Sequence, residues 1–153
     1  MQIKQTKDHE LISQLNQEVQ NIHATMYPEH FKEYDHVTVS DFYKLIMNYS
    51  NFQFYTIEEN DMALGYVWIE IKEYKENAFR KSYKSIYVHQ LNILEAHRNK
   101  GLGKKIMNKV NDIAELNNIK KIELDYWSKN DSAKNFYEKN GYIRYREFLY
   151  KDL

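Results

Sequence analysis

The 153-residue sequence predicts a single α/β (α+β) domain, in which helices flank a mixed, mostly antiparallel central sheet. Three observations predict it. Stretches rich in β-branched and aromatic residues alternate with stretches whose apolar residues recur every three or four positions. Their order is strand, helix, helix, three strands, helix, strand, helix and strand, which is typical of a sheet with antiparallel hairpins. No repeat, Pro/Ser-rich linker or low-complexity block divides the chain.

A short strand at 3–6 and a helix after it open this order. Apolar residues recur at helical spacing from Leu11 to Ile22, and Asp8 stands before them as a favourable N-cap. Pro28 interrupts the pattern, so residues 27–34 are predicted to form a loop or a short helical turn.

A second helix is predicted from Ser40, as its N-cap, through Tyr49. Aromatic and β-branched residues then predict a strand at 52–57, a hairpin and a strand at 63–71, followed by an exposed polar loop at 72–82. The remaining predicted elements are a strand at 85–93, a helix at 101–116, a strand at 120–127, a helix at 131–140 capped by Gly141, and a last strand at 142–150.

Composition and charge exclude several classes of function. The 22 basic and 22 acidic residues balance without forming a basic stripe, which argues against a nucleic-acid partner or an anionic membrane surface. The absence of cysteine excludes disulfides, thiolate metal ligands and a cysteine nucleophile, and it suits the cytoplasm. The histidines show no metal-ligand spacing, and no apolar run approaches the length of a membrane span. We therefore expect no metal and no membrane.

The stretch HRNKGLGKK, at 97–105, has the composition of an anion-binding turn. It joins a predicted strand to a predicted helix, whose first backbone N–H groups lack intrahelical partners and whose dipole favours negative charge. Gly101 and Gly103 let the backbone approach a ligand closely. The spacing fits neither a Walker loop nor the dinucleotide-binding G-x-G-x-x-G pattern. The alternative interpretation is an ordinary helix N-terminus with solvated lysines.

The stretch NDSAKNFYEKNGY, at 130–142, carries an unusual helix face. The spacing of Asn130, Ala133 and Tyr137 places them on one side of a helix. An amide, a small residue and a phenol do not make an ordinary core stripe. The alternative is structural, with Asn130 as the N-cap and Tyr137 as a half-buried anchor.

Together these features resemble the GNAT superfamily of acyl-CoA-dependent N-acetyltransferases. The strand YVHQLNIL, the turn RNKGLG and the helix NDSAKNFYEKNGY occur in the family's order within residues 85–150. The resemblance implies one GNAT-like domain over 1–153 with a twisted central sheet. It also implies an acetyl-CoA-binding half at 84–150 and an acceptor-binding half at 1–83, although the first half resembles the family only in its order of elements.

The resemblance implies where acetyl-CoA is bound. The turn would hold the pyrophosphate through its backbone, and Asn130 would bond the pantetheine arm. The strand at 91–93 would splay from its neighbour and pair with that arm, and a bulge there would aim an N–H at the thioester oxygen. The implied binding residues are Leu91, Asn92, Ile93, Arg98, Asn99, Lys100, Gly101, Leu102, Gly103, Lys104, Asn130, Ala133 and Tyr137.

Catalysis needs an acid for the leaving thiolate and a base for the acceptor ammonium. The resemblance implies Tyr137 as the acid. Tyr87 stands where some family members have a glutamate base, so His89 and Glu70 are the alternative bases, and a water chain is a third. An early loop would form the acceptor wall through Tyr27, His30, Phe31 and Tyr34.

The sequence therefore predicts an enzyme, an acetyl-CoA-dependent N-acetyltransferase. It would acetylate a primary amine of a small molecule or peptide by direct attack in a ternary complex. The alternative is a non-catalytic acyl-CoA-binding sensor or scaffold of the same fold. Aromatic residues near the C-terminus make a homodimer plausible.

Overall fold

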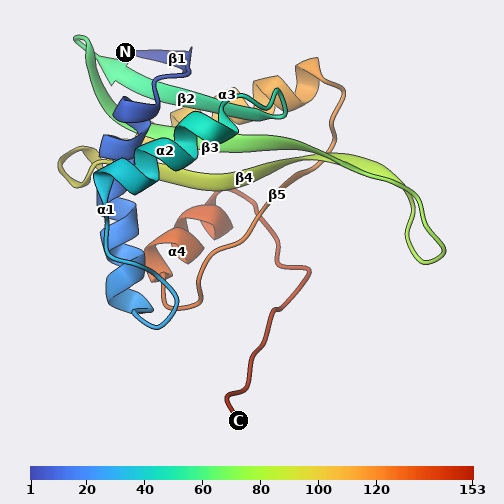
Figure 1. The fold of residues 1–153 in the computed structure, drawn as a ribbon. Helices are drawn as coiled ribbons and strands as arrows, with labels where there is room; N and C mark the ends of the chain where they lie inside the picture. The colour runs from blue at the N-terminus through green and yellow to red at the C-terminus, as the bar shows by residue number, and fades with distance from the viewer.

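A five-stranded sheet forms the centre of the protein in the computed structural model, which describes residues 1–153. Its strands follow one another across the sheet in chain order (Figure 1). The first four are antiparallel to their neighbours, and the last is parallel to the fourth, which confirms the predicted fold class. The strands are β1 (Gln2–Thr6), β2 (Phe52–Glu59), β3 (Met62–Tyr74), β4 (Tyr83–Ile93) and β5 (Ile122–Leu124).

Helices cover both faces of this sheet and divide the core in two. On one face, residues such as Ile57, Val67 and Ile86 pack against Ile106 and Val110 of α3. On the other face, Phe54 and Tyr66 pack against Ile12 and Leu15 of α1 and Tyr43 of α2. The helices are α1 (His9–Met26), α2 (His36–Ile46), α3 (Leu102–Leu116) and α4 (Asp131–Lys139), with a 3-10 turn at Glu95–His97. None of them is long and apolar enough to cross a membrane.

The helix starts follow capping chemistry. Asp8 caps α1 as predicted, since its carboxylate accepts the N–H of Leu11 at 2.9 Å. The predicted start of the second helix at Ser40 is wrong. Asp35 caps α2 by accepting the N–H of Thr38 at 2.8 Å, and Ser40 lies buried inside the helix. The helix also ends at Ile46, before Tyr49.

Strand lengths differ from the prediction at several places. β3 and β4 continue past the predicted boundaries into a long hairpin that projects from the body, so the connecting loop is confined to 75–82 (Figure 1). β5 keeps only three residues of the predicted 120–127 strand. The predicted strand at 142–150 is wrong, because these residues pair with no strand of their own chain and form an extended tail.

A β-bulge in β4 changes which side chains share a face. Trp68 pairs with Gln90 while Ile69 pairs with Val88, so His89 is the additional residue. As a result, the consecutive side chains of His89 and Gln90 both lie on the face that α1 and α2 cover. The bulge therefore falls at His89 rather than within 91–93, where we expected it.

Candidate active site

The glycine turn ends in a row of unused backbone donors. Asn99 and Gly101 both have positive φ, and Gly101 is the N-cap of α3. The first N–H to bond within the helix is that of Lys105, which donates to the Gly101 carbonyl at 3.1 Å. The N–H groups from Asn99 to Lys104 meet no acceptor in the chain. Such a row at a helix N-terminus is suited to a phosphate or pyrophosphate.

The Arg98 side chain stabilises the shape of this turn through contacts within the protein. Its Nε donates to the Ile93 carbonyl at 2.8 Å, and its guanidinium lies 3.1 Å from the Glu18 carboxylate. Its backbone N–H donates to Glu95 at 3.1 Å. Of the predicted pyrophosphate set, Arg98 is thus the residue whose N–H is already used, and it fixes the shape of the turn.

The two glycines of the turn serve different needs. Gly101 adopts φ +76°, a left-handed conformation that favours glycine. A Cβ on Gly103 would come within 3.0 Å of the Phe136 ring, so Gly103 lets α3 and α4 approach each other. The glycine at 103 is explained by helix packing and needs no ligand.

β4 and β5 separate beside this turn. Their parallel pairing ends at Val88 and Leu124, and β4 continues to Ile93 without a partner on that side. The N–H of Leu94 donates to Leu64 on β3, while the Ile93 carbonyl faces the other way and accepts from Arg98. By alternation, the backbone groups of Leu91 face the side that β5 leaves open.

Asn92 lies differently from its two predicted neighbours. Its side chain is buried and donates to the Leu15 carbonyl of α1 at 2.8 Å. Its own carbonyl lies against Gly65 of β3. The backbone of Leu91 and the N–H of Ile93 therefore face the open edge, the Ile93 carbonyl accepts from Arg98, and Asn92 joins β4 to α1.

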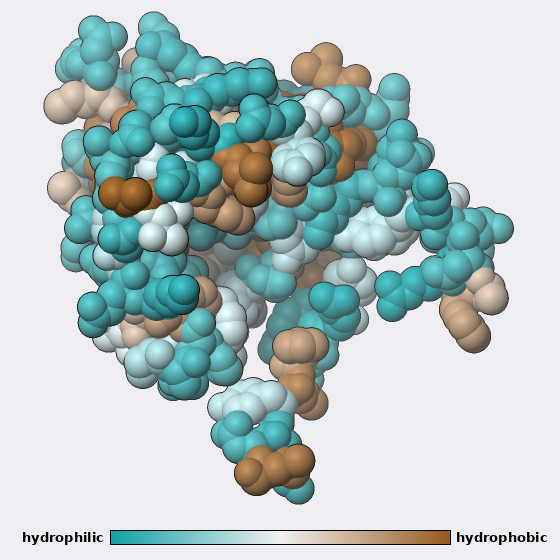
Figure 2. All heavy atoms as spheres, viewed as in Figure 1, coloured by the Kyte–Doolittle hydropathy of each residue, from teal (hydrophilic) through white to brown (hydrophobic).

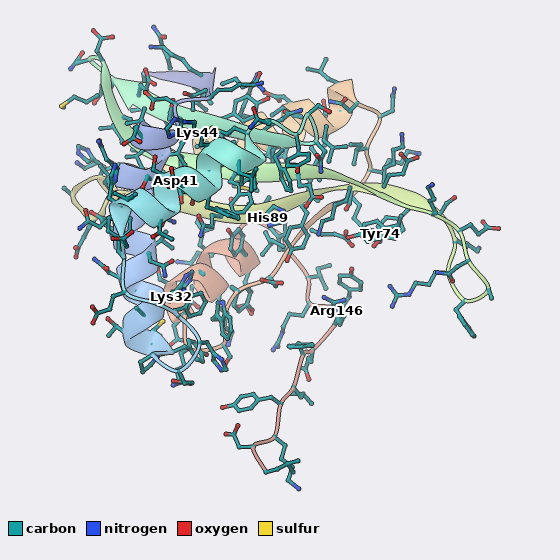
Figure 3. All side chains as sticks on the ribbon, viewed as in Figure 1. Lys32, Asp41, Lys44, Tyr74, His89 and Arg146 are labelled. Carbon is teal, nitrogen blue, oxygen red and sulfur yellow. The ribbon has the colours of Figure 1, made fainter.

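The two candidate bases form a hydrogen-bonded pair. His89 Nε2 lies 2.7 Å from a Glu70 carboxylate oxygen, and the imidazole stacks on Trp68 with ring centroids 4.3 Å apart. Figure 3 shows His89 on β4 near the middle of the sheet. Burial lowers the pKa of His89, although the Glu70 carboxylate acts in the opposite direction. The neutral imidazole that donates from Nε2 keeps a lone pair on Nδ1, which is what a base requires.

The ammonium group of Lys72 lies beside this pair, and the Tyr87 ring links it to the carboxylate of Asp125. Lys72 Nζ is 3.6 Å from the same Glu70 oxygen and 4.1 Å from the centre of the Tyr87 ring. The Tyr87 hydroxyl donates to Asp125 at 2.6 Å. The residue in the position of the family's glutamate is thus a tyrosine whose ring face, together with the Glu70 carboxylate, holds a cation.

Tyr137 lies buried on α4 among aromatic rings. Its ring is parallel to that of Tyr126, at 6.3 Å, and edge-on to Tyr142, at 5.4 Å. Burial raises the pKa of the Tyr137 phenol well above its usual range, and Tyr142 and Asp125 act in the same direction. The phenol is therefore protonated near neutral pH, as an acid must be.

Asn130 has the structural role that the sequence left open as an alternative. Its Oδ1 accepts the N–H of Ala133 at 3.0 Å and so caps α4. The amide nitrogen makes no hydrogen bond within the protein and can still donate.

The four residues predicted to form the acceptor wall contact other parts of the protein. Tyr27 is buried, and its hydroxyl accepts the N–H of Lys129 at 3.0 Å. Phe31 packs edge-on against Trp127 at 4.9 Å, and His30 is 5.6 Å from the same indole. Tyr34 donates to the Ser13 carbonyl at 2.8 Å. These side chains attach the loop to α1 and to the segment after β5.

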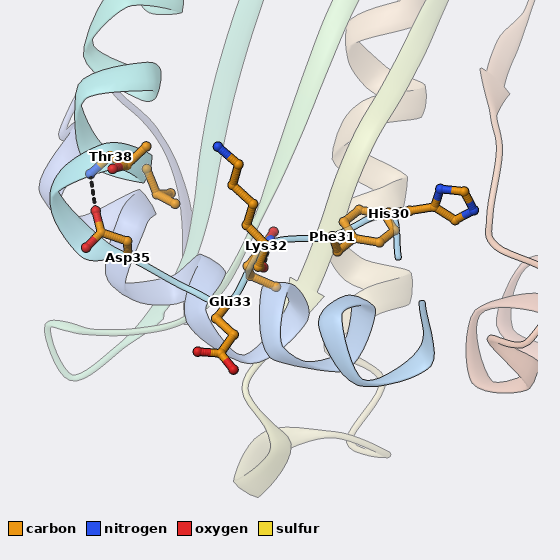
Figure 4. Close-up of a pocket in the computed structure, with 8 residues that line it drawn as sticks. His30, Phe31, Lys32, Glu33, Asp35 and Thr38 are labelled. Atoms are coloured by element: carbon orange, nitrogen blue, oxygen red, sulfur yellow. Dashed lines mark hydrogen bonds between the residues drawn. The ribbon is translucent and has the colours of Figure 1, made fainter. Parts of the chain in front are cut away.

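A shallow hollow of about 390 Å³ opens beside this loop (Figure 4). Its walls include His30, Phe31, Lys32, Glu33 and Asp35. None of Glu70, His89 and Tyr137 lines it. The hollow is therefore separate from the candidate acid and bases.

The sequence interpretation missed Trp68, Lys72, Asp125 and Gln90. Trp68 and Lys72 share a face of β3 with Glu70 by strand alternation, so that signal was present. Asp125 follows β5 and reaches Tyr87 only through the strand pairing. The side of Gln90 depends on the bulge, which no residue pattern indicates. No group of three or more His, Asp or Glu is clustered so as to hold a metal ion.

Solved structures of other proteins share this fold. The chain is similar over its whole length to the tetramutant of BH1408 from Bacillus halodurans, with 18% identity, full coverage of both chains and a TM-score of 0.94. It is similar to a putative acetyl transferase from Pyrococcus furiosus, with 21% identity, 99% of both chains covered and a TM-score of 0.74. It is also similar to the aminoglycoside N-acetyltransferase AAC(6')-Iy in complex with CoA, with 13% identity, 99% and 93% coverage and a TM-score of 0.71.

The model of the acetyltransferase (GNAT) family matches residues 16–142. That range includes the glycine turn, the open edge of β4, the Glu70–His89 pair and Tyr137. The chain therefore belongs to the GNAT acetyltransferase family.

Proposed function

We propose that the protein transfers an acetyl group from acetyl-CoA to a primary amine by direct attack in a ternary complex. The observation that carries this proposal is the row of free N–H groups from Asn99 to Lys104, next to the open edge of β4. The turn fits a pyrophosphate, and the backbone of Leu91 and Ile93 fits an extended pantetheine arm. Acetyl-CoA supplies the activated acetyl group.

The residues at the site have matching roles in proton transfer. His89, held by Glu70, takes a proton from the acceptor ammonium, directly or through water. The amine nitrogen then forms a bond to the thioester carbonyl carbon, and the carbon–sulfur bond breaks. Tyr137 donates its proton to the departing thiolate. No side-chain nucleophile is needed, so the acetyl group passes in one transfer.

The acceptor that this site favours is a cation. Lys72 already brings an ammonium group to the Glu70 carboxylate and the Tyr87 ring face. An acceptor ammonium would find the same partners beside His89. Carboxylates together with aromatic faces select cationic amines over neutral ones.

The coenzyme site can be tested by removing one backbone donor. Lys104 is exposed, and its N–H bonds to nothing in the helix. Proline is tolerated in the first turn of a helix, so Lys104→Pro removes this donor at little structural cost. Lys104→Ala is the matched control, because it removes the same charge and keeps the N–H. We expect Lys104→Pro to bind acetyl-CoA at least about tenfold more weakly than Lys104→Ala. Equal affinities in calorimetry would contradict the assignment.

Turnover needs a separate experiment. A thiol-release assay over polyamines, aminoglycosides, amino-acid amides and peptide N-termini should show catalysis with at least one cationic amine. Acetyl-CoA binding with no turnover on any amine would favour the alternative, an acyl-CoA-binding sensor or scaffold of the same fold.

A further inference from the structure

Lys72 holds its ammonium group beside the candidate base. Its Nζ lies 3.6 Å from Glu70 Oε2, and the same oxygen lies 2.7 Å from Nε2 of His89. Nζ also lies 4.1 Å from the centre of the Tyr87 ring. Because Tyr87 pairs with Glu70, and Lys72 is the next residue but one on β3, these side chains share one face of the sheet. A primary amine of the protein itself therefore lies where the proposed function brings the acceptor.

Lys84 provides a matched comparison on the same hairpin. Its Nζ lies 3.6 Å from a Glu73 carboxylate oxygen, the same distance as in the Lys72–Glu70 pair. Its side chain is 56% exposed, against 30% for Lys72, and the projecting hairpin that carries it is largely hydrophilic (Figure 2). Glu73 has no histidine partner. Reagents in solution thus reach Lys84 more easily, whereas Lys72 shares its carboxylate with an imidazole.

The Lys72 side chain is able to leave its carboxylate. A separation of 3.6 Å is longer than a hydrogen bond, and an ion pair with a partly exposed lysine is weak. The four-carbon stem of a lysine is flexible and can carry the amine to a new position. Nζ can therefore move from the Glu70 carboxylate toward a group bound beside His89 while β3 keeps its place in the sheet.

The proposed function sets where that group must be bound. An acceptor nitrogen has to reach both the base and the thioester carbonyl carbon in one complex, so the carbonyl lies within reach of an amine beside His89. Lys72 is such an amine, because Glu70 contacts both side chains. An amine of the same chain also has a higher effective concentration than a dissolved one. Lys72 is therefore positioned to compete with a dissolved acceptor.

We propose that Lys72 is a modification site, and that the protein acetylates this residue with its own acetyl-CoA when no acceptor is bound. The inference rests on the proposed function. Lys72 Nζ gives a proton to His89 and forms a bond to the thioester carbonyl carbon, and the carbon–sulfur bond breaks. Tyr137 donates a proton to the thiolate, which leaves as coenzyme A. Of the protons that the ammonium loses, one passes through His89 to solvent, and the other replaces the proton that Tyr137 has given.

Acetylation changes the charge at the acceptor position. The neutral amide no longer pairs with Glu70, so this carboxylate and the Tyr87 ring face become available to the ammonium group of an acceptor. Burial lowers the pKa of His89 most, and the positive charge of Lys72 lowers this pKa further. Because acetylation removes that charge, the acidic limb of the kcat/KM profile should lie at higher pH in the acetylated protein. Self-acetylation thus adjusts the pH range in which acceptors react.

Mass spectrometry tests the modification. The natural protein is incubated with acetyl-CoA without an acceptor amine, and acetylation of Lys72 and of Lys84 is followed in the same sample. We expect Lys72 to be acetylated at least about tenfold faster than Lys84, at a rate per molecule that does not depend on protein concentration. Uncatalysed acetylation would favour the more exposed Lys84. Equal rates at the two lysines, or a rate at Lys72 that rises with protein concentration, would overturn the proposal.

His89→Gln separates catalysis from the plain reactivity of a lysine. It should slow the acetylation of Lys72 at least about tenfold and leave that of Lys84 unchanged, while circular dichroism reports that the variant is folded. Equal acetylation of Lys72 with and without His89 would overturn the proposal. A protein that acetylates dissolved amines but not Lys72 would keep the proposed function and lose this inference, whereas a protein that acetylates neither would lose both.

Discussion

At the scale of single residues, the proposed role of the Tyr137 hydroxyl as the acid can be tested by removing it. Tyr137→Phe keeps the ring among its aromatic neighbours and removes the proton donor. We expect the turnover number to fall about 10²- to 10⁴-fold, with little change in acetyl-CoA affinity, because the proton is transferred in the transition state. Steady-state kinetics with a good amine measures this change.

Tyr142→Phe is the matched control for this prediction. It removes the hydroxyl of a half-buried tyrosine whose ring contacts Tyr137, and it should leave turnover near that of the natural protein. A Tyr137→Phe protein that keeps most of its turnover would remove Tyr137 from the catalytic residues and leave solvent as the acid.

The environment of His89 predicts two opposite shifts of the pH profile. The base works when its imidazole is neutral, so kcat/KM rises with pH through the pKa of His89. Glu70 raises this pKa and Lys72 lowers it, although burial has the largest effect. Glu70→Gln should therefore move the acidic limb of the profile to lower pH, and Lys72→Gln should move it to higher pH. Limbs that shift in the same direction, or do not shift, would contradict His89 as the base.

At the scale of elements, two substitutions of Asn130, at the N-terminus of α4, distinguish helix capping from coenzyme binding. Asn130→Ala removes the cap and should lower the free energy of unfolding by about 1 kcal/mol. Asn130→Asp keeps the cap but loses the amide donor. If that amide bonds the pantetheine, Asn130→Asp should remain stable and bind acetyl-CoA several-fold more weakly in calorimetry. Unchanged binding by Asn130→Asp would leave this residue with its capping role alone.

The elements also show which features a sequence can predict. Asp8, with the helical spacing after it, is a local signal, and α1 starts where this signal places it. Asp35 carries an equally local signal, but the N-cap was predicted at Ser40, which is buried inside α2. The glycine turn and the α4 face were recognisable because their residues are close in sequence.

Pairing across the sheet was not predictable in the same way. The His89 bulge depends on the register between β3 and β4, which also brings Lys72 to the Tyr87 ring, and the pairing of β4 with β5 brings Asp125 to the Tyr87 hydroxyl. The tail at 142–150 has the composition of a strand, yet a strand forms only where a partner lies beside it. Non-local pairing, and not local propensity, decides these features.

At the scale of the whole molecule, one half-buried amide, that of Gln90, joins both N-terminal helices to the sheet. The Gln90 carbonyl oxygen accepts from Asn16 of α1 at 3.0 Å, from Tyr43 of α2 at 2.8 Å and from Tyr66 of β3 at 2.6 Å. Gln90 follows His89 directly, and the bulge puts both side chains on the same face, so this network lies beside the candidate base. The network thus joins α1, α2 and β3 to β4 at one point.

Gln90→Leu keeps much of the side-chain volume and leaves these donors without their acceptor. We expect the free energy of unfolding to fall by about 2–4 kcal/mol, since each unsatisfied buried polar group costs about 1–3 kcal/mol and Tyr43 and Tyr66 keep a long mutual contact of 3.4 Å. Gln53→Leu is the matched control on β2. Gln53 accepts only from Tyr55, at 2.8 Å, so its loss leaves one donor without its acceptor and should cost about 1 kcal/mol. Urea unfolding measures both values. Equal losses would mean that the network contributes no more than one side-chain hydrogen bond, and that α1 and α2 are held to the sheet by their apolar contacts alone.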